Sequence, residues 1–540
     1  MSLADRKLVA REATISTALA AALAALLLWW APPGIDWAAH AYQRTFLLHH
    51  GFAIWNNFWY AGRYSFVTYS LLYYPLAAIL GIRVLALASI STAAFAFSMV
   101  VFRQWGPASR LSSRTFAVLW VGIIGAAAFP FALATSFALL ALWALQENRR
   151  GRFALCAALT LAASPLAFAF LVVVLAGAAL ARRRIRDERL PIAAVALCVV
   201  AELVLNRLFG GGGRFPYGLL QLAPSLIFGV LGLVVTRGVP QARLLRGVFW
   251  AYLVVCLAAY FVPTAVGSNL ERLRYVALPV ALIAAALRGW RPLWLVAPAV
   301  ALAAVWNTTP IVGTYAAAGT DREASPAYWA PTIAYLKAHL SPSFRVEVVD
   351  TAEHWSAAYL PEAGIPIVRG WYRQSDFPQN ELLYDSKLGA ATYDRWLRRM
   401  AVRYVVVPDA PPDYSSRTEQ ALITSDATSL VPVASTPHTT IYEVPHATPL
   451  VTGPTPADVL YLWSSRVVFE TGGPGAYTIR VRWSPYWHAS SGCVAKTRDG
   501  MTRITTRHAG LVELWFGLTV TRGLQTLAGR IPQCSTTARH

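Results

Sequence analysis

Few side chains in the first 310 residues could take a proton from a substrate. Eight of these residues are acidic: Asp5, Glu12, Asp36, Glu147, Asp187, Glu188, Glu202 and Glu271. Five of the eight fall in arginine-flanked termini or loops that we predict to be cytoplasmic. A carboxylate base for a reaction outside the cytoplasm must therefore come from Asp36, Glu202, Glu271 or the C-terminal half.

Asp36 is the strongest candidate because it directly follows the first apolar run, within Gly34-Ile35-Asp36-Trp37-Ala38-Ala39-His40. Asp36 and His40 are four positions apart and share one face of a helix. Asp36 could deprotonate an acceptor hydroxyl, and His40 could orient the acid, bind a phosphate or ligate a metal. The alternative is a helix N-cap aspartate with a histidine at the wet interface. The spacing alone leaves both open.

A second group of charges lies in the loop Asn269-Leu270-Glu271-Arg272-Leu273-Arg274-Tyr275. Two arginines are uncommon on the outer side of a span, and the planar guanidinium suits a phosphate or pyrophosphate. The alternative is an exposed ion pair with Glu271. Arg63 is a further arginine predicted on the outer side and a weaker candidate for phosphate binding. For Glu202 we favour a structural pairing with Arg207, one turn away.

Aromatic residues are dense after Asp36: Trp55, Trp59, Tyr60, Tyr64, Tyr69, Tyr73 and Tyr74. Most are expected to form a membrane-interface belt, although Trp59 and Tyr73 could also stack on a sugar ring. His49-His50 lacks companions at metal-ligand spacing, so no metal site is predicted.

These residues must be positioned by a membrane domain. The chain is 56% hydrophobic and 14% charged, against about 25% charged in soluble domains. Apolar runs punctuated by arginine clusters continue to about residue 310. The net charge of +20 therefore reflects cytoplasmic loops rather than nucleic-acid binding.

The topology follows from five arginine clusters that we predict to be cytoplasmic: Arg103/Arg110/Arg114, Arg149/Arg150/Arg152, Arg182–Arg184 with Arg186 and Arg189, Arg237/Arg243/Arg246, and Arg288/Arg291. The stretches Thr115–Gln146 and Phe153–Ala181 lie between cytoplasmic clusters. We interpret them as hairpins broken at Pro130 and Pro165. Broken helices are tolerated in a membrane where other protein or a cavity satisfies the backbone hydrogen bonds. Single spans are expected at 14–30, 190–208, 218–236, 247–264, 275–287 and 293–309. The stretch Phe66–Phe102 leads from an outer loop to the cytoplasmic cluster at Arg103, so the number of crossings must be odd. We therefore expect one span plus a re-entrant or surface-lying piece. The total is ten to twelve membrane segments.

The C-terminal half resembles an ordinary globular protein. Helices are predicted at Tyr328–Leu340 and Tyr393–Met400, with strands at Arg345–Val349 and Arg403–Val407. After Pro445, short alternating strands and glycine turns predict a small β-sandwich. The predicted domains are a membrane domain at 1–310, an α/β subdomain at 311–445 and a β-rich subdomain at 446–540. Cys493 and Cys534 could pair in an oxidising compartment.

In combination, several motifs resemble bacterial membrane proteins of the GT-C glycosyltransferase architecture, including the 6-pyruvoyl-tetrahydropterin synthase-related membrane domain family. The motifs are Asp36–His40, Trp55, Gly62, Tyr73-Tyr74-Pro75-Leu76, Ser164-Pro165 and the outer pair Arg272/Arg274. The resemblance covers about residues 1–310 and, more loosely, the C-terminal half. This chain departs from the pattern at Tyr74, which replaces a proline, and it lacks a second outer Asp-x-Asp motif, which argues against a metal-dependent mechanism.

The resemblance implies a hexosyl- or pentosyltransferase that takes a sugar from a polyprenyl-phosphate donor and passes it to a glycan, lipid or protein acceptor outside the membrane. Asp36 would be the base, and Arg272 and Arg274 would bind the donor phosphate. No other cofactor is expected. The protein would lie in the bacterial cytoplasmic membrane with its N-terminus inside and its C-terminal half outside. The alternative is a non-catalytic scaffold or lipid-binding protein that displays the C-terminal half.

Overall fold

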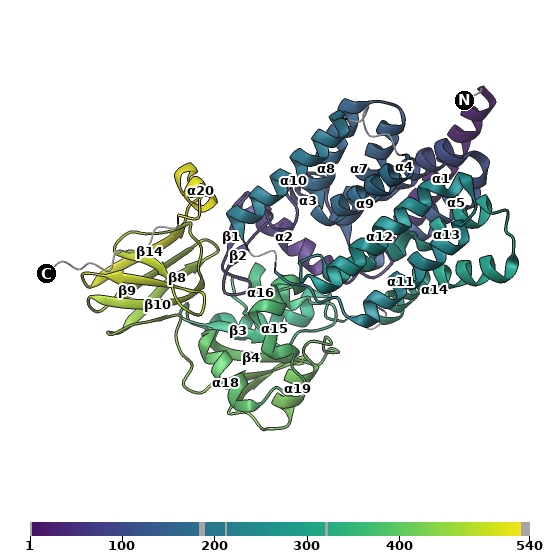
Figure 1. The fold of residues 1–540 in the computed structure, drawn as a ribbon. Helices are drawn as coiled ribbons and strands as arrows, with labels where there is room; N and C mark the ends of the chain where they lie inside the picture. Colours follow the sequence, from purple (N-terminus) through teal and green to yellow (C-terminus); the bar gives the residue numbers. More distant parts are fainter. Residues whose placement is uncertain (1–2, 183–188, 211–212, 319–321, 531–540) are drawn as a thin grey trace. The chain divides into compact units, whose positions relative to one another are not determined.

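The computed structural model describes residues 3–182, 189–210, 213–318 and 322–530. The chain forms two compact units, each assembled from separate segments. The helical unit contains residues 1–37, 69–203 and 212–320, and the mixed unit contains residues 38–68, 204–211 and 321–540. Figure 1 shows the ribbon in sequence colours, with helices α1 to α14 at its purple-to-teal end.

The helical unit consists of long apolar helices joined by short turns. Its helices are α1 (Leu3–Trp30), α3 (Tyr73–Leu80), α4 (Ile82–Trp105), α5 (Arg110–Leu119), α6 (Ile123–Ala126), α7 (Phe129–Gln146), α8 (Arg150–Ala163), α9 (Pro165–Arg182), α10 (Arg189–Phe209, which continues into the mixed unit), α11 (Leu219–Thr236), α12 (Arg243–Phe261), α13 (Ala277–Leu287) and α14 (Leu293–Ala318). Among the described residues, seven helical stretches are long and apolar enough to cross a bilayer. The chain is therefore a multi-pass membrane protein.

The predicted breaks in the long apolar stretches are confirmed. Pro130 lies in the first turn of α7, after Ala127 in the left-handed conformation, where its missing N–H costs no helical hydrogen bond. Ser164 is extended between α8 and α9, and α9 begins at Pro165. The ambiguous stretch 66–102 contains the short helix α3 and most of the single long helix α4, which agrees with the prediction of one span plus a shorter piece.

The mixed unit contains an α/β layer built on one four-stranded sheet. Its strand order is β3-β4-β6-β5, with β3 (Arg345–Val348) parallel to β4 (Val402–Pro408) and with β6 (Thr439–Glu443) antiparallel to both β4 and β5 (Val431–Ser435). The helices of this part are α2 (Trp37–His50), α15 (Pro326–His339), α16 (Ser356–Glu362), α17 (Arg373–Gln379), α18 (Ala390–Arg399) and α19 (Arg417–Thr424). The predicted helices and strands at 328–410 are thus confirmed.

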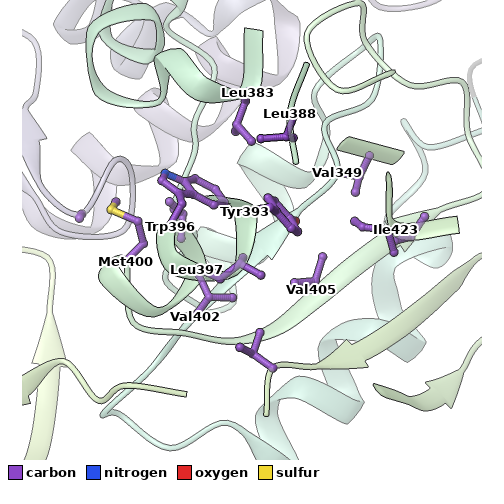
Figure 2. Packing of buried hydrophobic residues seen from close by; sticks show 14 of the residues in the cluster. Val349, Leu383, Leu388, Tyr393, Trp396, Leu397, Met400, Val402, Val405 and Ile423 are labelled. Carbon is purple, nitrogen blue, oxygen red and sulfur yellow. The ribbon is translucent and has the colours of Figure 1, made fainter. Parts of the chain in front are cut away.

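A buried apolar cluster holds this layer together. Trp396 and Leu397 from α18 pack with Val405 of β4 and Ile423 of α19 (Figure 2). The helix α18 presents apolar residues on one side and the basic pair Arg398 and Arg399 in its last turn. The strand β4 is almost wholly buried, which explains its continuous run of valines.

The predicted β-sandwich is also confirmed. One sheet has the order β12-β13-β10-β7 and the other β11-β14-β9-β8. Their inward residues, including Phe469, Tyr477, Ile479 and Leu514, form one buried core. The strands are β7 (Val451–Thr452), β8 (Ala457–Trp463), β9 (Arg466–Thr471), β10 (Gly475–Arg482), β11 (Trp487–Ala489), β12 (Cys493–Lys496), β13 (Met501–Thr506) and β14 (Gly510–Phe516), followed by α20 (Val520–Leu527).

The expected aromatic belt is wrong for the segment after α2. Trp55, Trp59 and Tyr60 are at most 2% exposed. Residues 38–68 fold into the mixed unit, where the hairpin of β1 (Trp55–Asn56) and β2 (Arg63–Tyr64) packs on the sandwich. The Trp55 ring lies 5.3 Å from that of Trp487 and belongs to the sandwich core. These aromatic rings therefore fill a protein core instead of a lipid interface.

Candidate active site

Asp36 is held in place by its backbone. It lies after α1 and directly before α2. The Ile35 amide donates to the carbonyl of Gly125 (3.0 Å), and the Asp36 amide donates to that of Ala126 (3.3 Å). A Cβ at Gly34 would lie 2.2 Å from the Ile124 carbonyl oxygen, so only glycine permits this approach. The position of the carboxylate is therefore set by main-chain contacts with α6.

The structure brings the cationic side chain of Arg272 close to Asp36. Its Nη2 lies 3.9 Å from Asp36 Oδ2, and the two side chains are 20% and 12% exposed. The Arg272 guanidinium also lies 5.3 Å from the centre of the Phe131 ring. A charge-assisted hydrogen bond would measure about 2.7–2.9 Å. The two groups thus form a loose ion pair between largely buried side chains, and the long distance would let an anion compete for the guanidinium.

The turn that presents Arg272 is the 3₁₀ segment η4 (Gly267–Val276). Gly267 has a φ of +40°, and a Cβ there would overlap the Phe215 carbonyl oxygen at 1.7 Å. The Tyr252 hydroxyl donates to the Leu270 carbonyl at 3.3 Å. Both contacts tie η4 to the neighbouring parts of the helical unit, so Arg272 is carried by a supported turn.

The other two charged residues of η4 face each other. Arg274 Nη1 lies 3.8 Å from Glu271 Oε2, three positions away. Burial raises the pKa of Glu271, while the guanidinium of Arg274 opposes the shift. The predicted pair Arg272/Arg274 is thus split: Arg272 faces Asp36, and Arg274 faces Glu271.

The other predicted site residues are divided between the two units. Tyr73 is fully buried at the start of α3, with its ring 5.3 Å from that of Tyr74. His40, Trp59 and Arg63 belong to the mixed unit. Their roles in substrate binding stay predictions.

Within the mixed unit, these three residues gather near Trp371 and Tyr372. The Trp59 indole donates to the Ala357 carbonyl at 2.9 Å, and its ring lies 5.7 Å from that of Tyr372. The Arg63 guanidinium lies 3.7 Å from the centre of the Tyr372 ring. The His40 and Trp371 rings are 6.4 Å apart. A sugar could reach the buried Trp59 face only if this packing opened.

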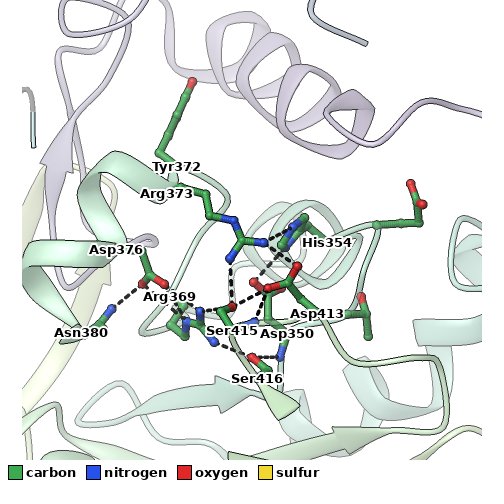
Figure 3. Close-up of polar contacts among 12 residues, drawn as sticks. Asp350, His354, Arg369, Tyr372, Arg373, Asp376, Asn380, Asp413, Ser415 and Ser416 are labelled. Carbon is green, nitrogen blue, oxygen red and sulfur yellow. Dashed lines mark hydrogen bonds and ion pairs between the residues drawn. The ribbon is translucent and has the colours of Figure 1, made fainter. Parts of the chain in front are cut away.

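Sequence reasoning missed a buried polar network in the mixed unit (Figure 3). Arg369 donates to Asp376 Oδ2 at 2.7 Å and to the hydroxyls of Ser415 (2.9 Å) and Ser416 (2.6 Å). Asn380 and Tyr384 each donate to Asp376 at 2.7 Å. Burial would raise the pKa of Asp376, but Arg369 and these donors lower it below its ordinary value.

A second part of the network consists of two further ion pairs. Arg373 pairs with Asp413 at 2.5 Å, and His354 pairs with Asp350 at 2.8 Å. Burial lowers the pKa of His354, but the carboxylate of Asp350 outweighs it and raises the pKa overall. Each of these charges has an opposite charge beside it. The network therefore joins loops of the mixed unit, and we assign it a structural role.

No group of three or more His, Cys, Asp or Glu side chains in the described parts of the chain could hold a metal ion. Cys534 of the predicted disulfide lies outside the described residues, so its pairing with Cys493 stays a prediction. Cys156, Cys198 and Cys256 are free thiols.

Comparison with known proteins gives structural neighbours only. No protein-family model and no curated protein sequence matches the chain. Among solved structures, the chain is similar to the arabinofuranosyltransferase AftD from Mycobacteria (TM-score 0.47, 15% identity, 96% of this chain and 60% of AftD). It is also similar to ArnT from Cupriavidus metallidurans bound to undecaprenyl phosphate (TM-score 0.37, 14% identity, 83% of this chain and 99% of ArnT). The chain thus spans 60% of the length of the AftD chain.

Both neighbours are GT-C-fold glycosyltransferases, the architecture that the sequence motifs resemble. The predicted architecture, a helical membrane domain followed by a β-rich region, is confirmed. Membership of the 6-pyruvoyl-tetrahydropterin synthase-related family stays a prediction. Similarity at this level of identity assigns no activity, substrate or residue role to this chain.

Proposed function

We propose that this protein is an inverting membrane glycosyltransferase that moves a sugar from a polyprenyl-phosphate donor to an acceptor outside the cytoplasm. The observation that supports the proposal is the loose pair of Asp36 and Arg272 at 3.9 Å, beside the end of the first apolar helix. A base and an anion-binding cation within one site are what such a transfer needs.

The proposed step has four bond changes. Asp36 takes the proton from the acceptor hydroxyl while the acceptor oxygen attacks the anomeric carbon of the sugar. The bond between that carbon and the phosphate oxygen breaks, and its electron pair goes to the departing lipid phosphate. Arg272 stabilises the negative charge that develops there, assisted by Arg274 from the same turn. Attack opposite the leaving group inverts the anomeric configuration.

The loose geometry of the pair suits this sequence of events. Before the donor binds, Arg272 offsets the charge of Asp36 in a site where both side chains are largely buried. An incoming phosphate offers the guanidinium a bidentate partner. Arg272 can then turn toward the phosphate and leave the carboxylate available as a base.

The proposed partners and location follow from the same reaction. The membrane partner is a polyprenyl phosphate, and the mixed unit binds a glycan, lipid or protein acceptor. The N-terminus would be cytoplasmic and the mixed unit extracytoplasmic, in a bacterial cytoplasmic membrane.

The decisive variant is Asp36→Asn in the full-length protein in lipid nanodiscs. Polyprenyl-phosphate-linked hexoses and pentoses are offered with candidate acceptors, and product is measured by mass spectrometry. Loss of a general base is expected to lower kcat by about 10²–10⁴-fold with donor binding retained. The matched control is Asp458→Asn, the same chemical change at an exposed carboxylate in β8, which should leave turnover unchanged.

Two outcomes would overturn the proposal. Turnover by Asp36→Asn close to that of the parent would remove Asp36 as the base. Absence of transfer by the parent from every donor, with the lipid phosphate still bound, would favour the non-catalytic lipid-binding alternative.

A further inference from the structure

The last described helix, α20, turns its apolar residues outward. Val520 is 82% exposed and Leu524 is 62% exposed, and Leu527 continues the same stripe. Spacings of four and three residues place these side chains on one face of a helix. Leu518, also exposed, precedes them. A soluble helix buries such a stripe against its own protein, and none of the α20 residues is buried.

The other face of α20 packs against the end of a membrane span. A Cβ at Gly523 would lie 3.8 Å from Leu208, and one at Gly529 would lie 3.1 Å from the Arg207 guanidinium. The Tyr486 hydroxyl donates a hydrogen bond to the Leu208 carbonyl at 2.9 Å and forms another hydrogen bond with the Thr526 side chain. Leu208 and Arg207 belong to the last turn of α10, and this turn and α20 lie in the same compact unit.

The contact with residues 207–208 determines the depth of α20 relative to the bilayer. The helix α10 is one of the stretches that can cross the bilayer, and it ends at Phe209. The end of a span lies at the boundary between hydrocarbon and headgroups. A helix packed beside residues 207–208 therefore lies at the membrane surface, where an outward apolar stripe meets lipid.

The charge of the segment fits a lipid surface. Residues 516–530 contain Arg522 and Arg530 and no aspartate or glutamate. Arg207 adds a third guanidinium beside Gly529. Basic side chains at this depth are attracted to the phosphates of lipid headgroups. An apolar face with adjacent cations is the pattern of a helix that lies in the plane of the interface.

We propose that α20 is an interfacial membrane helix. Its face of Val520, Leu524 and Leu527 inserts into the leaflet at which α10 ends, and its arginines contact lipid phosphates. The helix thereby attaches the β-sandwich to the bilayer surface through a second point besides the membrane spans. This inference does not depend on the proposed transferase activity.

The test measures membrane depth at two leucines of equal exposure. Leu524 on α20 and Leu511 on β14 are each 62% exposed, but Leu511 lies at the end of β14 away from α20. Leu524→Cys and Leu511→Cys are made in the full-length protein, labelled with a nitroxide and placed in nanodiscs of phosphatidylcholine and phosphatidylglycerol. The parent protein, treated in the same way, gives the background from its own cysteines.

Collision with oxygen reports lipid, and collision with a water-soluble nickel chelate reports solvent. At position 524, oxygen is expected to relax the label severalfold more than nickel, and at position 511 the order reverses. Val520→Cys, on the same stripe, should repeat the result for position 524 if either substitution disturbs folding. Equal nickel access at positions 524 and 511 would overturn the proposal. Protection of position 524 from both reagents would also overturn it, because protein would then cover the stripe.

Discussion

Replacing Arg369 by methionine would test how far the buried network stabilises the mixed unit. The Arg369 side chain is 4% exposed and lies 2.7 Å from Asp376. Methionine keeps much of the apolar volume but leaves Asp376 as a buried carboxylate, with Asn380 and Tyr384 as its remaining donors in the network. Removing one partner of a buried ion pair costs about 3–5 kcal/mol.

That cost corresponds to a large shift in melting temperature. For a unit of about 150–250 residues, 1 kcal/mol corresponds to about 2–4 °C, so the expected fall is about 6–20 °C. The matched control is Arg403→Met. Arg403 makes an equally short contact with Glu443 (2.6 Å), but the two side chains are 33% and 32% exposed. An exposed pair contributes about 1 kcal/mol or less, so this control should shift the midpoint by at most about 4 °C.

The assay is limited proteolysis of the full-length protein in nanodiscs over a temperature series. Peptides from residues 345–425 report the temperature at which the mixed unit opens. The double variant Arg369→Met/Asp376→Leu should recover part of the loss, because the buried carboxylate of Asp376 is removed together with its cation, whereas Glu419, 3.7 Å from Arg369, stays without that cation. A midpoint for Arg369→Met no lower than for Arg403→Met would show that the buried ion pair stabilises the mixed unit no more than the exposed one. A double variant as unstable as the single one would show that the unpaired carboxylate of Asp376 does not cause the loss.

Two further predictions concern the site and pH. Arg272→Gln should raise the KM for the lipid-phosphate donor and lower kcat, whereas Arg272→Lys, which keeps the charge but loses the planar fork, should show smaller changes in both constants. Steady-state kinetics in nanodiscs would measure these constants. Equal kinetics for the Gln variant, the Lys variant and the parent would exclude Arg272 from phosphate binding. Burial raises the pKa of Glu419 from 4.5 to about 7, although Arg369 opposes the shift. The folded state therefore binds the proton of Glu419 more tightly than the unfolded state does. The resulting stabilisation is present below about pH 4.5 and is lost as the pH rises toward 7. The melting temperature of the mixed unit should therefore fall over that range, and Glu419→Gln should flatten the fall; identical slopes in the two proteins would contradict the assignment.

The residue pattern alone predicted most of the helices and strands and the order of membrane domain and β-rich region, but not that residues 38–68 fold into the mixed unit. The breaks before Pro130 and Pro165, the buried strand at 402–408 and the two sheets of the sandwich all leave local marks, because hydrophobic period, proline and glycine act over a few neighbouring residues. The same reasoning selected Asp36 and Arg272, since acids beside apolar spans and arginines on the outer side are both scarce.

Tertiary structure alone decided which of these residues meet. Asp36 and Arg272 come together because the backbone at 35–36 bonds to α6 and because Gly267 lets η4 approach Phe215. Trp55 enters the sandwich core and Arg369 meets Ser415 through contacts between segments that are far apart in the sequence. Such contacts leave no period in the sequence, because the partner of a buried ring or charge is chosen by how the elements pack and not by its neighbours along the chain.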